Sequence, residues 1–328
     1  FVLDTGSADN SVKILKKRGA IVKSKKYDPW RFDDARNDSL DLVDKDADIC
    51  VCTDIDEVFT KGWRKKLEKI WNKGLTRIYY KLNTHIDKSN KPRTSLYISK
   101  IHNRNDYKWS FPIHEVLTYT KEGEEKVLTT DEFEINHYPD EEKSRANYLS
   151  LLKLAVKENP LNDRCMHYLG REYMFHRKWN KAIDTLIKYL SLESATWKYE
   201  RSAAMRYIGK CYKNLKRMEE AILWFTKSVI ETQDMREGLG EIGVIYYEQG
   251  KYREAEQVFL MCLNLQERTK NYMSENIWWS GYVEDLLSIC KYNLGKKEDA
   301  LKYAKKALEL KPGDERIKNN IKIIENME

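Results

Sequence analysis

The chain has 328 residues, of which 41% are hydrophobic and 34% charged, a composition that excludes a disordered chain and indicates about two folded domains. It contains only 14 glycines and 6 prolines, and long segments rich in Ala, Leu, Lys, Glu and Tyr predict helices in the second half and exclude an all-β protein. The net charge of +7 is spread thinly over both halves, which favours solvated surfaces over a concentrated nucleic-acid-binding stripe.

The first 140 residues alternate predicted strands with predicted helices. Alternation of this kind predicts a parallel-centred α/β sheet, in which ligands lie at the carboxyl ends of the strands. We expect strands at 1–4, 21–27, 49–53 and 76–82, and helices at 12–18, 33–42 and 63–71.

Two acidic motifs fall at predicted strand ends. Asp4 closes the first strand and is followed by a Gly-Ser turn, and Asp54-Ile55-Asp56 follows the apolar strand at 49–53. Two carboxylates at this spacing can act together on one divalent cation, which can in turn neutralise a diphosphate. The alternative is a solvated surface turn, because D-x-D is frequent by chance.

The second half repeats one pattern four times. An alanine lies 12 residues after a Gly or Ser in each copy: 170 to 182, 209 to 221, 243 to 255 and 288 to 300. Small residues at these two positions let a pair of antiparallel helices approach closely, while Tyr, Phe and Leu fill the groove between them. The pattern resembles the tetratricopeptide repeat, which implies a helical solenoid that holds a peptide or protein partner or forms a dimer.

The repeats set the domain boundaries. We expect an α/β domain at 1–140, a connecting helix at 141–162 and a repeat domain at 163–328. The intervals between successive repeat alanines are 39, 34 and 45 residues, so the first and last joints contain insertions. Residues 266–279 are expected to form the insertion of the last joint, as an extended helix or a loop.

Six motifs of the first half, in order, resemble those of family 2 glycosyltransferases with a GT-A-type fold, and the repeats follow as in their bacterial relatives with tetratricopeptide repeats. The resemblance implies a nucleotide-sugar-binding domain. It rests on Phe1–Asn10 (V-D-x-G-S-x-D), Trp30–Asn37 (A-R-N), Thr53–Glu57 (D-x-D), Lys100–Arg104, Trp109–Val116 and Ile135–Tyr138.

This resemblance implies donor-binding residues. Asp4 would lie near the nucleobase or ribose, although Thr5 stands where many relatives carry a second Asp. Arg36 would contact the donor phosphates, where a guanidinium fork suits bidentate anion binding. Asp33 would orient Arg36 or hold the ribose, and Asp54 would also bind the ribose. A surface ion pair of Arg36 with Asp33 or Asp38 is the alternative.

Further implied donor residues are His102 and Arg104, which alternate with Lys100 along a predicted strand and would hold the leaving diphosphate. A solvated strand face is the alternative. The implied metal ligands are Asp56, Asp54 and His137, with Mn²⁺ or Mg²⁺ as the ion.

The pair His114-Glu115 is the implied catalytic centre. Inverting transfer needs a base that takes the proton from the acceptor hydroxyl as it attacks the anomeric carbon. We expect Glu115 to be this base and His114 to orient the acceptor or approach the phosphates.

One strand of the family's sheet is missing. Relatives carry an earlier strand beside the one that ends at Asp4, and Phe1 is not a start methionine. We therefore expect the sequence to be a truncated form of a longer protein.

The leading hypothesis is a metal-dependent inverting glycosyltransferase that moves a sugar from a nucleotide diphosphate donor, most simply a UDP-sugar, to a protein, peptide or glycan acceptor. The alternatives are a repeat-based adaptor with a catalytically inactive α/β domain, and a nucleotidyltransferase. No apolar run is long enough to span a bilayer and no secretory signal is present, so we expect a cytoplasmic protein with reduced thiols.

Overall fold

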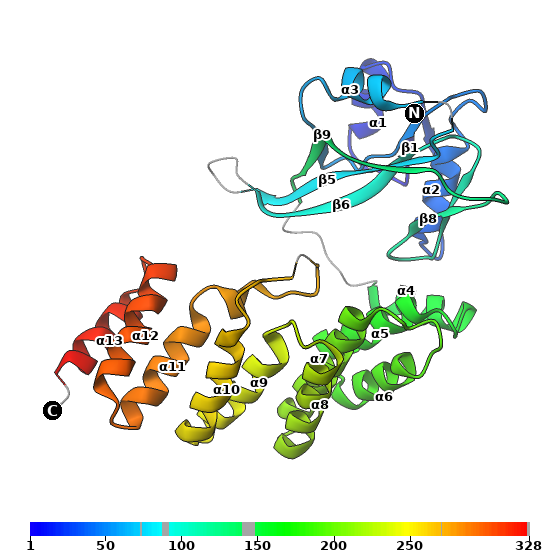
Figure 1. Cartoon of the computed structure of the whole chain (residues 1–328). Helices are drawn as coiled ribbons and strands as arrows, with labels where there is room; N and C mark the ends of the chain where they lie inside the picture. The colour runs from blue at the N-terminus through cyan, green and yellow to red at the C-terminus, as the bar shows by residue number, and fades with distance from the viewer. Residues whose placement is uncertain (73, 87–91, 140–147, 270, 327–328) are drawn as a thin grey trace. The chain divides into compact units, whose positions relative to one another are not determined.

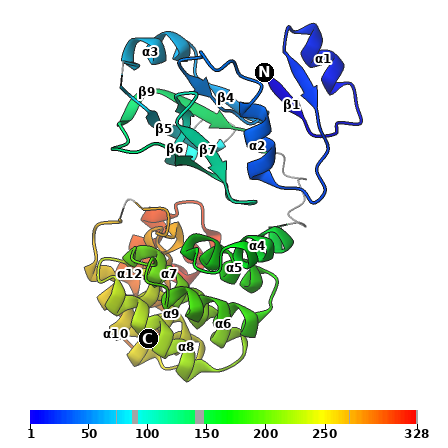
Figure 2. The same cartoon turned by 90° about the vertical axis from the view of Figure 1, so that its right-hand side faces the viewer.

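The computed structural model describes residues 1–326 apart from 73, 87–91, 140–147 and 270. The chain forms two compact units, residues 1–158 and 159–328 (Figures 1 and 2). None of the described helices has both the length and the apolar character that crossing a bilayer requires. All six cysteines are free thiols.

The first unit is an α/β domain. Its described elements, in chain order, are β1 (Val2–Asp4), α1 (Ser11–Lys17), β2 (Val22–Ser24), α2 (Phe32–Leu40), β3 (Cys50–Val51), β4 (Glu57–Phe59), α3 (Trp63–Ile70), β5 (Arg77–Ile86), β6 (Pro92–His102), β7 (Tyr107–Ser110), β8 (Val116–Tyr119), β9 (Val127–His137) and α4 (Tyr148–Glu158).

The strands form one larger and two smaller sheets. β1 and β2 pair in parallel, β7 and β8 form an antiparallel pair, and five strands pair in the order β3-β6-β5-β9-β4. The predicted parallel-centred sheet is wrong for the five-stranded sheet, in which β5–β9 is parallel and the other described pairs are antiparallel. β5 and β6 follow one another closely in sequence, and such a short connection permits only antiparallel pairing.

The core of this unit lies between the five-stranded sheet and α3. Phe59 of β4 stacks on Trp63 of α3, with ring centroids 4.3 Å apart. Leu67 of α3 is buried by the same sheet face. The other buried members of this core come from the three central strands: Ile78, Tyr80, Ile101, Phe133 and Ile135.

The second unit is a series of helix pairs. Its described helices are α5 (Asp163–Phe175), α6 (Trp179–Leu190), α7 (Lys198–Asn214), α8 (Met218–Glu231), α9 (Glu237–Glu248), α10 (Tyr252–Asn264), the short 3₁₀ helix η1 (Asn276–Trp279), α11 (Tyr282–Asn293), α12 (Lys297–Leu310) and α13 (Glu315–Glu325).

The predicted close approach of paired helices is present. A Cβ atom added to Gly170 would lie 2.5 Å from Leu186, and one added to Gly209 would lie 2.6 Å from Phe225. The four repeat alanines have no exposed surface: Ala182, Ala221, Ala255 and Ala300. Because larger residues would force the helices apart, these small residues set the distance within each pair.

The turn inside each pair also repeats. The residue seven positions after the small residue has a positive φ in every pair: 55° at Arg177, 62° at Lys216, 71° at Gly250 and 75° at Gly295. A left-handed residue at the end of a helix reverses the chain sharply, so the second helix can return along the first.

The close approach predicts the effect of a methyl group. Alanine usually stabilises a helix by about 0.5–1 kcal/mol relative to glycine. In Gly243→Ala, however, the new Cβ would lie 2.4 Å from Cε1 of Phe259. We expect a loss of about 1–3 kcal/mol of stability, measured by thermal denaturation followed at a helical circular-dichroism band.

Gly313→Ala is the matched control, because an added Cβ there has no neighbour within 4 Å. Its expected effect is within about 0.5 kcal/mol. Equal melting temperatures for Gly243→Ala and the unmodified chain would contradict the packing argument.

Candidate functional site

The Asp54-Ile55-Asp56 segment crosses one end of the five-stranded sheet. It connects β3, at one edge, with β4, at the other. At its start Cys52 donates its N–H to the carbonyl of Lys100, and at its end the carbonyl of Asp56 accepts from the N–H of Tyr138. The side chain of Ile55 is exposed. The segment thus places two carboxylates near different strands.

Arg36 joins three separate parts of this domain. From α2, its Nη2 lies 2.8 Å from Oδ1 of Asp54, and its Nε donates to Oε1 of Glu115 at 3.0 Å. Its guanidinium also lies over the ring of Trp109, 5.0 Å from the centroid. The partners of Arg36 are therefore Asp54 and Glu115, and not Asp33 or Asp38.

The neighbouring Asn37 explains how α2 is held in place. Its side-chain amide donates to the carbonyl of Trp109 at 2.9 Å, and its side-chain oxygen accepts from the N–H of the same residue at 2.8 Å. The N–H of Phe32 donates to the carbonyl of Pro112. These bonds fix α2 against β7, so the preceding side chain in the A-R-N segment, that of Arg36, reaches Glu115.

Lys100 completes the ion-pair network on the other side of Asp54. Its Nζ lies 2.8 Å from Oδ2 of Asp54 and 2.7 Å from Oε1 of Glu57. The second oxygen of Glu57 accepts the N–H of Asp54. Burial alone would raise the pKa of Asp54, but the charges of Lys100 and Arg36 outweigh it and hold the pKa below its ordinary value.

The loop between β7 and β8 carries the predicted catalytic pair. Two of its non-glycine residues have positive φ, 80° at Phe111 and 53° at His114. Such conformations cost free energy and persist where surrounding contacts enforce them, often at functional sites. Glu115 is held by Arg36, whereas the ring of His114 lies 6.0 Å from that of Tyr148. The two members of the pair thus have different surroundings.

Asp56 and His137 form a separate pair. Oδ2 of Asp56 lies 3.3 Å from Nε2 of His137, and both side chains are partly exposed. A carboxylate and an imidazole suit Mn²⁺, and Mg²⁺ often takes only one or two protein carboxylates and completes its shell with phosphates and water. Asp56 and His137 fit such an ion, whereas both oxygens of Asp54 are held by cationic side chains. Among the described residues no three His, Cys, Asp or Glu side chains gather as a metal site.

Two predicted donor residues have structural partners of their own. Asp4 is buried at the end of β1 and accepts the N–H of Ser7. Hydrogen bonds from Ser7 lower the pKa of Asp4. Asp33 is buried and is held by both Nε and Nη2 of Arg31. Neither carboxylate belongs to the Arg36 network.

The other two predicted donor residues, His102 and Arg104, lie at and just after the end of β6. His102 has no exposed surface, its Nε2 lies 3.7 Å from Sγ of Cys52, and burial lowers its pKa to about 4. β6 ends at His102, so Arg104 lies beyond the strand, where its Nε donates to the carbonyl of Val43. The two side chains are buried in separate surroundings and do not line one exposed strand face.

The sequence pattern assigned no role to Glu57 or Asn37, and it placed Lys100 on a strand face with His102 and Arg104, near the leaving diphosphate. The network adds Glu57 and Lys100 as the partners of Asp54, and Asn37 as the residue that fixes α2. Glu57 directly follows Asp56 and Asn37 directly follows Arg36, so adjacency in sequence was a signal for these two residues, whereas Lys100 lies 46 positions from Asp54 and had no such signal.

A second candidate site lies on the repeats, where a loop packs against helices α7 and α9. We call residues 271–279 the covering segment. Nη2 of Arg206 donates to the carbonyl of Met273 at 2.9 Å, and the carboxylate of Glu275 lies 3.3 Å from Nζ of Lys210. The N–H of Glu275 donates to Oε1 of Glu237 at 2.7 Å. Three charged side chains of α7 and α9 therefore hold this segment.

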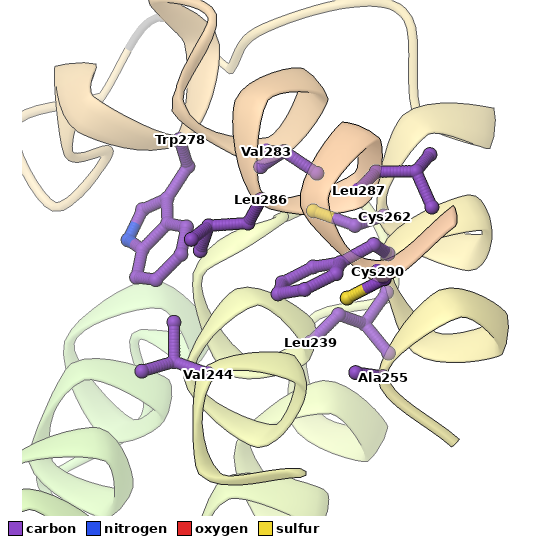
Figure 3. Close-up of a cluster of buried hydrophobic side chains, with 10 residues drawn as sticks. Leu239, Val244, Ala255, Cys262, Trp278, Val283, Leu286, Leu287 and Cys290 are labelled. Atoms are coloured by element: carbon purple, nitrogen blue, oxygen red, sulfur yellow. The ribbon is translucent and has the colours of Figure 1, made fainter. Parts of the chain in front are cut away.

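The covering segment also carries buried apolar side chains. Trp278 is 3% exposed and enters the cluster that includes Val244 and Leu286 (Figure 3). A Cβ added to Gly240 would lie 2.2 Å from its ring, so only glycine fits beneath the tryptophan. The predicted insertion at 266–279 thus contains a loop with a short 3₁₀ helix, apart from residue 270, which lies outside the described residues.

The shifted pKa of Asp54 predicts an acid-dependent contribution to stability. A carboxyl whose folded pKa is lowered contributes stability above its unfolded value, near 3.8, and loses it as the pH falls through the folded value. Asp54→Asn should cost on the order of 1 kcal/mol at pH 7, because the carboxylate is partly exposed. The difference in melting temperature should shrink at pH 3.

The exposed Asp46 supplies the control, since Asp46→Asn removes the same charge from the surface. It should leave the melting temperature nearly unchanged at both pH values. A deficit of Asp54→Asn that is equal at pH 7 and pH 3 would show that its carboxylate gives no pH-linked stability.

Comparison with family models and solved structures identifies the repeats. Models described as tetratricopeptide repeat match residues 169–237, 239–269 and 286–314, so the C-terminal half contains the predicted repeats. These matches lie outside the first unit, whose resemblance to glycosyltransferases stays a prediction. No curated protein sequence matches this chain.

Several solved structures are similar to this chain, and two of the following three are described as TPR proteins. A crystal structure of MamA is 19% identical, with 53% of this chain and 96% of that chain covered and a TM-score of 0.42. YrrB, described as a TPR protein with an unusual peptide-binding site, is 15% identical, with 54% and 83% covered and a TM-score of 0.41. The C-terminal part of a TPR repeat-containing protein from Cytophaga hutchinsonii is 20% identical, with 51% and 60% covered and a TM-score of 0.42.

Proposed function

We propose that the repeat domain binds a polypeptide partner. The observation that carries this proposal is the way in which α7 and α9 hold the covering segment. Their side chains contact a backbone carbonyl, a backbone N–H and a carboxylate of that segment. Any peptide has the two backbone groups, and a peptide with an acidic residue also has the carboxylate. Tetratricopeptide repeats, which occupy this half of the chain, commonly bind peptide or protein partners.

Panning the full chain against a random dodecapeptide library displayed on phage tests this function. We expect a recurring sequence, and a synthetic peptide of that sequence should bind saturably in calorimetry. The control is a parallel selection on an unrelated protein without helical repeats. Failure to enrich any sequence over that control would contradict the proposed function.

We also propose that the α/β domain transfers a sugar from a nucleotide diphosphate donor to the bound partner or to a glycan. The network of Arg36, Asp54 and Glu115 supports this proposal, because it gathers an anion-binding group and two carboxylates from segments far apart in sequence. Asp56 and His137 would hold the Mn²⁺ or Mg²⁺ ion, which when bound neutralises the diphosphate charge.

The protein groups would then have separate tasks. A diphosphate would compete with Asp54 and Glu115 for the guanidinium of Arg36, whose fork suits phosphate oxygens. Glu115, once released, would accept the proton of the acceptor hydroxyl as that oxygen attacks the anomeric carbon. Asp54 would remain tied to Lys100 and so keep the segment that carries Asp56 in position.

Donor binding has a direct test in thermal stability. A ligand that binds only the folded state raises the melting temperature, so UDP, GDP, TDP and CMP are compared with and without Mn²⁺. We expect one nucleotide to give a Mn²⁺-dependent rise, and Asp56→Ala to abolish that dependence. An unchanged Mn²⁺-dependent shift in Asp56→Ala would exclude the metal role of Asp56.

The proton transfer predicts a second, separate result. Glu115→Gln keeps the shape of the side chain, so the donor affinity should stay within about twofold. The transfer rate should fall by about 10²–10⁴, the usual contribution of a general base. Release of the nucleotide diphosphate from the donor measures the rate, with the exposed Glu122→Gln as the control. Transfer by Glu115→Gln at the unmodified rate would place the base elsewhere.

A further inference from the structure

A hollow of about 720 Å³ lies at the ends of α5 and α7, on the same domain as the covering segment. Its volume is in the range of ligand-binding clefts. Lys210 belongs to both places, because it lines the hollow and also binds Glu275 of the covering segment. The hollow therefore continues the face of α7 that already holds the covering segment.

The covering segment leaves this hollow as the site for a partner. Met273 and Trp278 are 4% and 3% exposed, and the ring of Trp278 requires glycine at position 240. Displacing both side chains would expose a large apolar area to water. The covering segment thus occupies its own contact surface on α7 and α9, and the hollow beside it stays open to a partner.

The hollow has an apolar wall from two successive helix pairs. Phe175, at the end of α5, is 55% exposed, and Trp179 begins α6. Met174 and Met218 also line it. Methionine side chains adapt to different apolar shapes. This wall suits one bulky apolar side chain of a partner.

The remaining wall carries three lysines, whose charges are unequally compensated. Lys210 lies 3.1 Å from a carboxylate oxygen of Glu241, and Lys213 lies 2.9 Å from one of Glu248. Lys216 is exposed and has no ion pair to a carboxylate among the described residues. Its backbone is held at a φ of 62° in the turn before α8, which fixes where its side chain starts.

We propose that this hollow binds a polypeptide segment in which an acidic residue lies next to a bulky apolar one, with the carboxylate at Lys216 and the apolar side chain against Phe175 and Trp179. The proposal rests on the polypeptide-binding function proposed above. The contact between Glu275 and Lys210 is the internal precedent for a peptide carboxylate on this face. A basic segment would place its charge beside Lys216, whereas the charges of Lys210 and Lys213 are compensated by Glu241 and Glu248, which also line the hollow.

The peptide library is again the probe, now with variants of the hollow. Peptides enriched on the unmodified chain should carry Asp or Glu within two positions of Leu, Phe or Trp. Fluorescence anisotropy with the synthetic peptide then compares Lys216→Glu and Phe175→Ser with the unmodified chain. Each should weaken the affinity by about tenfold, because charge reversal repels the acid and serine removes the apolar wall.

Lys305→Glu is the matched control, since Lys305 is an exposed lysine of α12 outside the hollow. The affinity of this variant for the peptide should stay within about twofold of that of the unmodified chain. Enriched peptides that bind both hollow variants as tightly as the unmodified chain would overturn the inference while leaving polypeptide binding intact. Enrichment of basic peptides would overturn it too. A library that yields no enriched sequence would overturn the polypeptide-binding function itself.

Discussion

The candidate site of the first unit depends on the ion pairs that the guanidinium of Arg36 forms with Asp54 and Glu115. This guanidinium binds Asp54 from the segment that crosses the sheet and Glu115 from the β7–β8 loop, so one charged group holds three parts of the chain together. Asn37 fixes the helix that presents it. The same group that organises the site in this structure is the one best suited to bind a diphosphate, which links stability of the site to its proposed function.

The packing of the second unit depends on small residues, as the candidate site of the first unit depends on ion pairs. Gly243 and Gly209 let paired helices touch, and Gly240 admits the ring of Trp278. The first two belong to the repeat pattern, whereas Gly240 serves the covering segment alone. The covering segment is therefore an addition to the repeat pattern, and the hollow next to it is lined in part by the end of α5 and the start of α8.

The sequence pattern predicted most of the helices and strands. It did not predict features that contacts between distant parts of the chain determine. The repeat helices followed from local spacing, because every pair uses the same small residues. The antiparallel pairing of β5 with β6 was missed, since strand alternation says nothing of hairpins further along the chain. Arg36 and Glu115 were singled out, but their contact across 79 positions was not, and Lys100 was not recognised as a partner of Asp54. The roles of these residues in sugar transfer stay predictions.

Hydrogen–deuterium exchange of the full chain with a UDP-sugar and Mn²⁺ tests the central claim most directly. If Arg36, Asp54 and Glu115 form a donor site, exchange should slow in the three segments that carry them, residues 32–40, 52–57 and 111–116. Exchange in the repeat helices should change little. Unchanged exchange in all three segments, with UDP-, GDP- and TDP-sugars alike, would contradict a nucleotide-sugar site and leave polypeptide binding as the function of this chain.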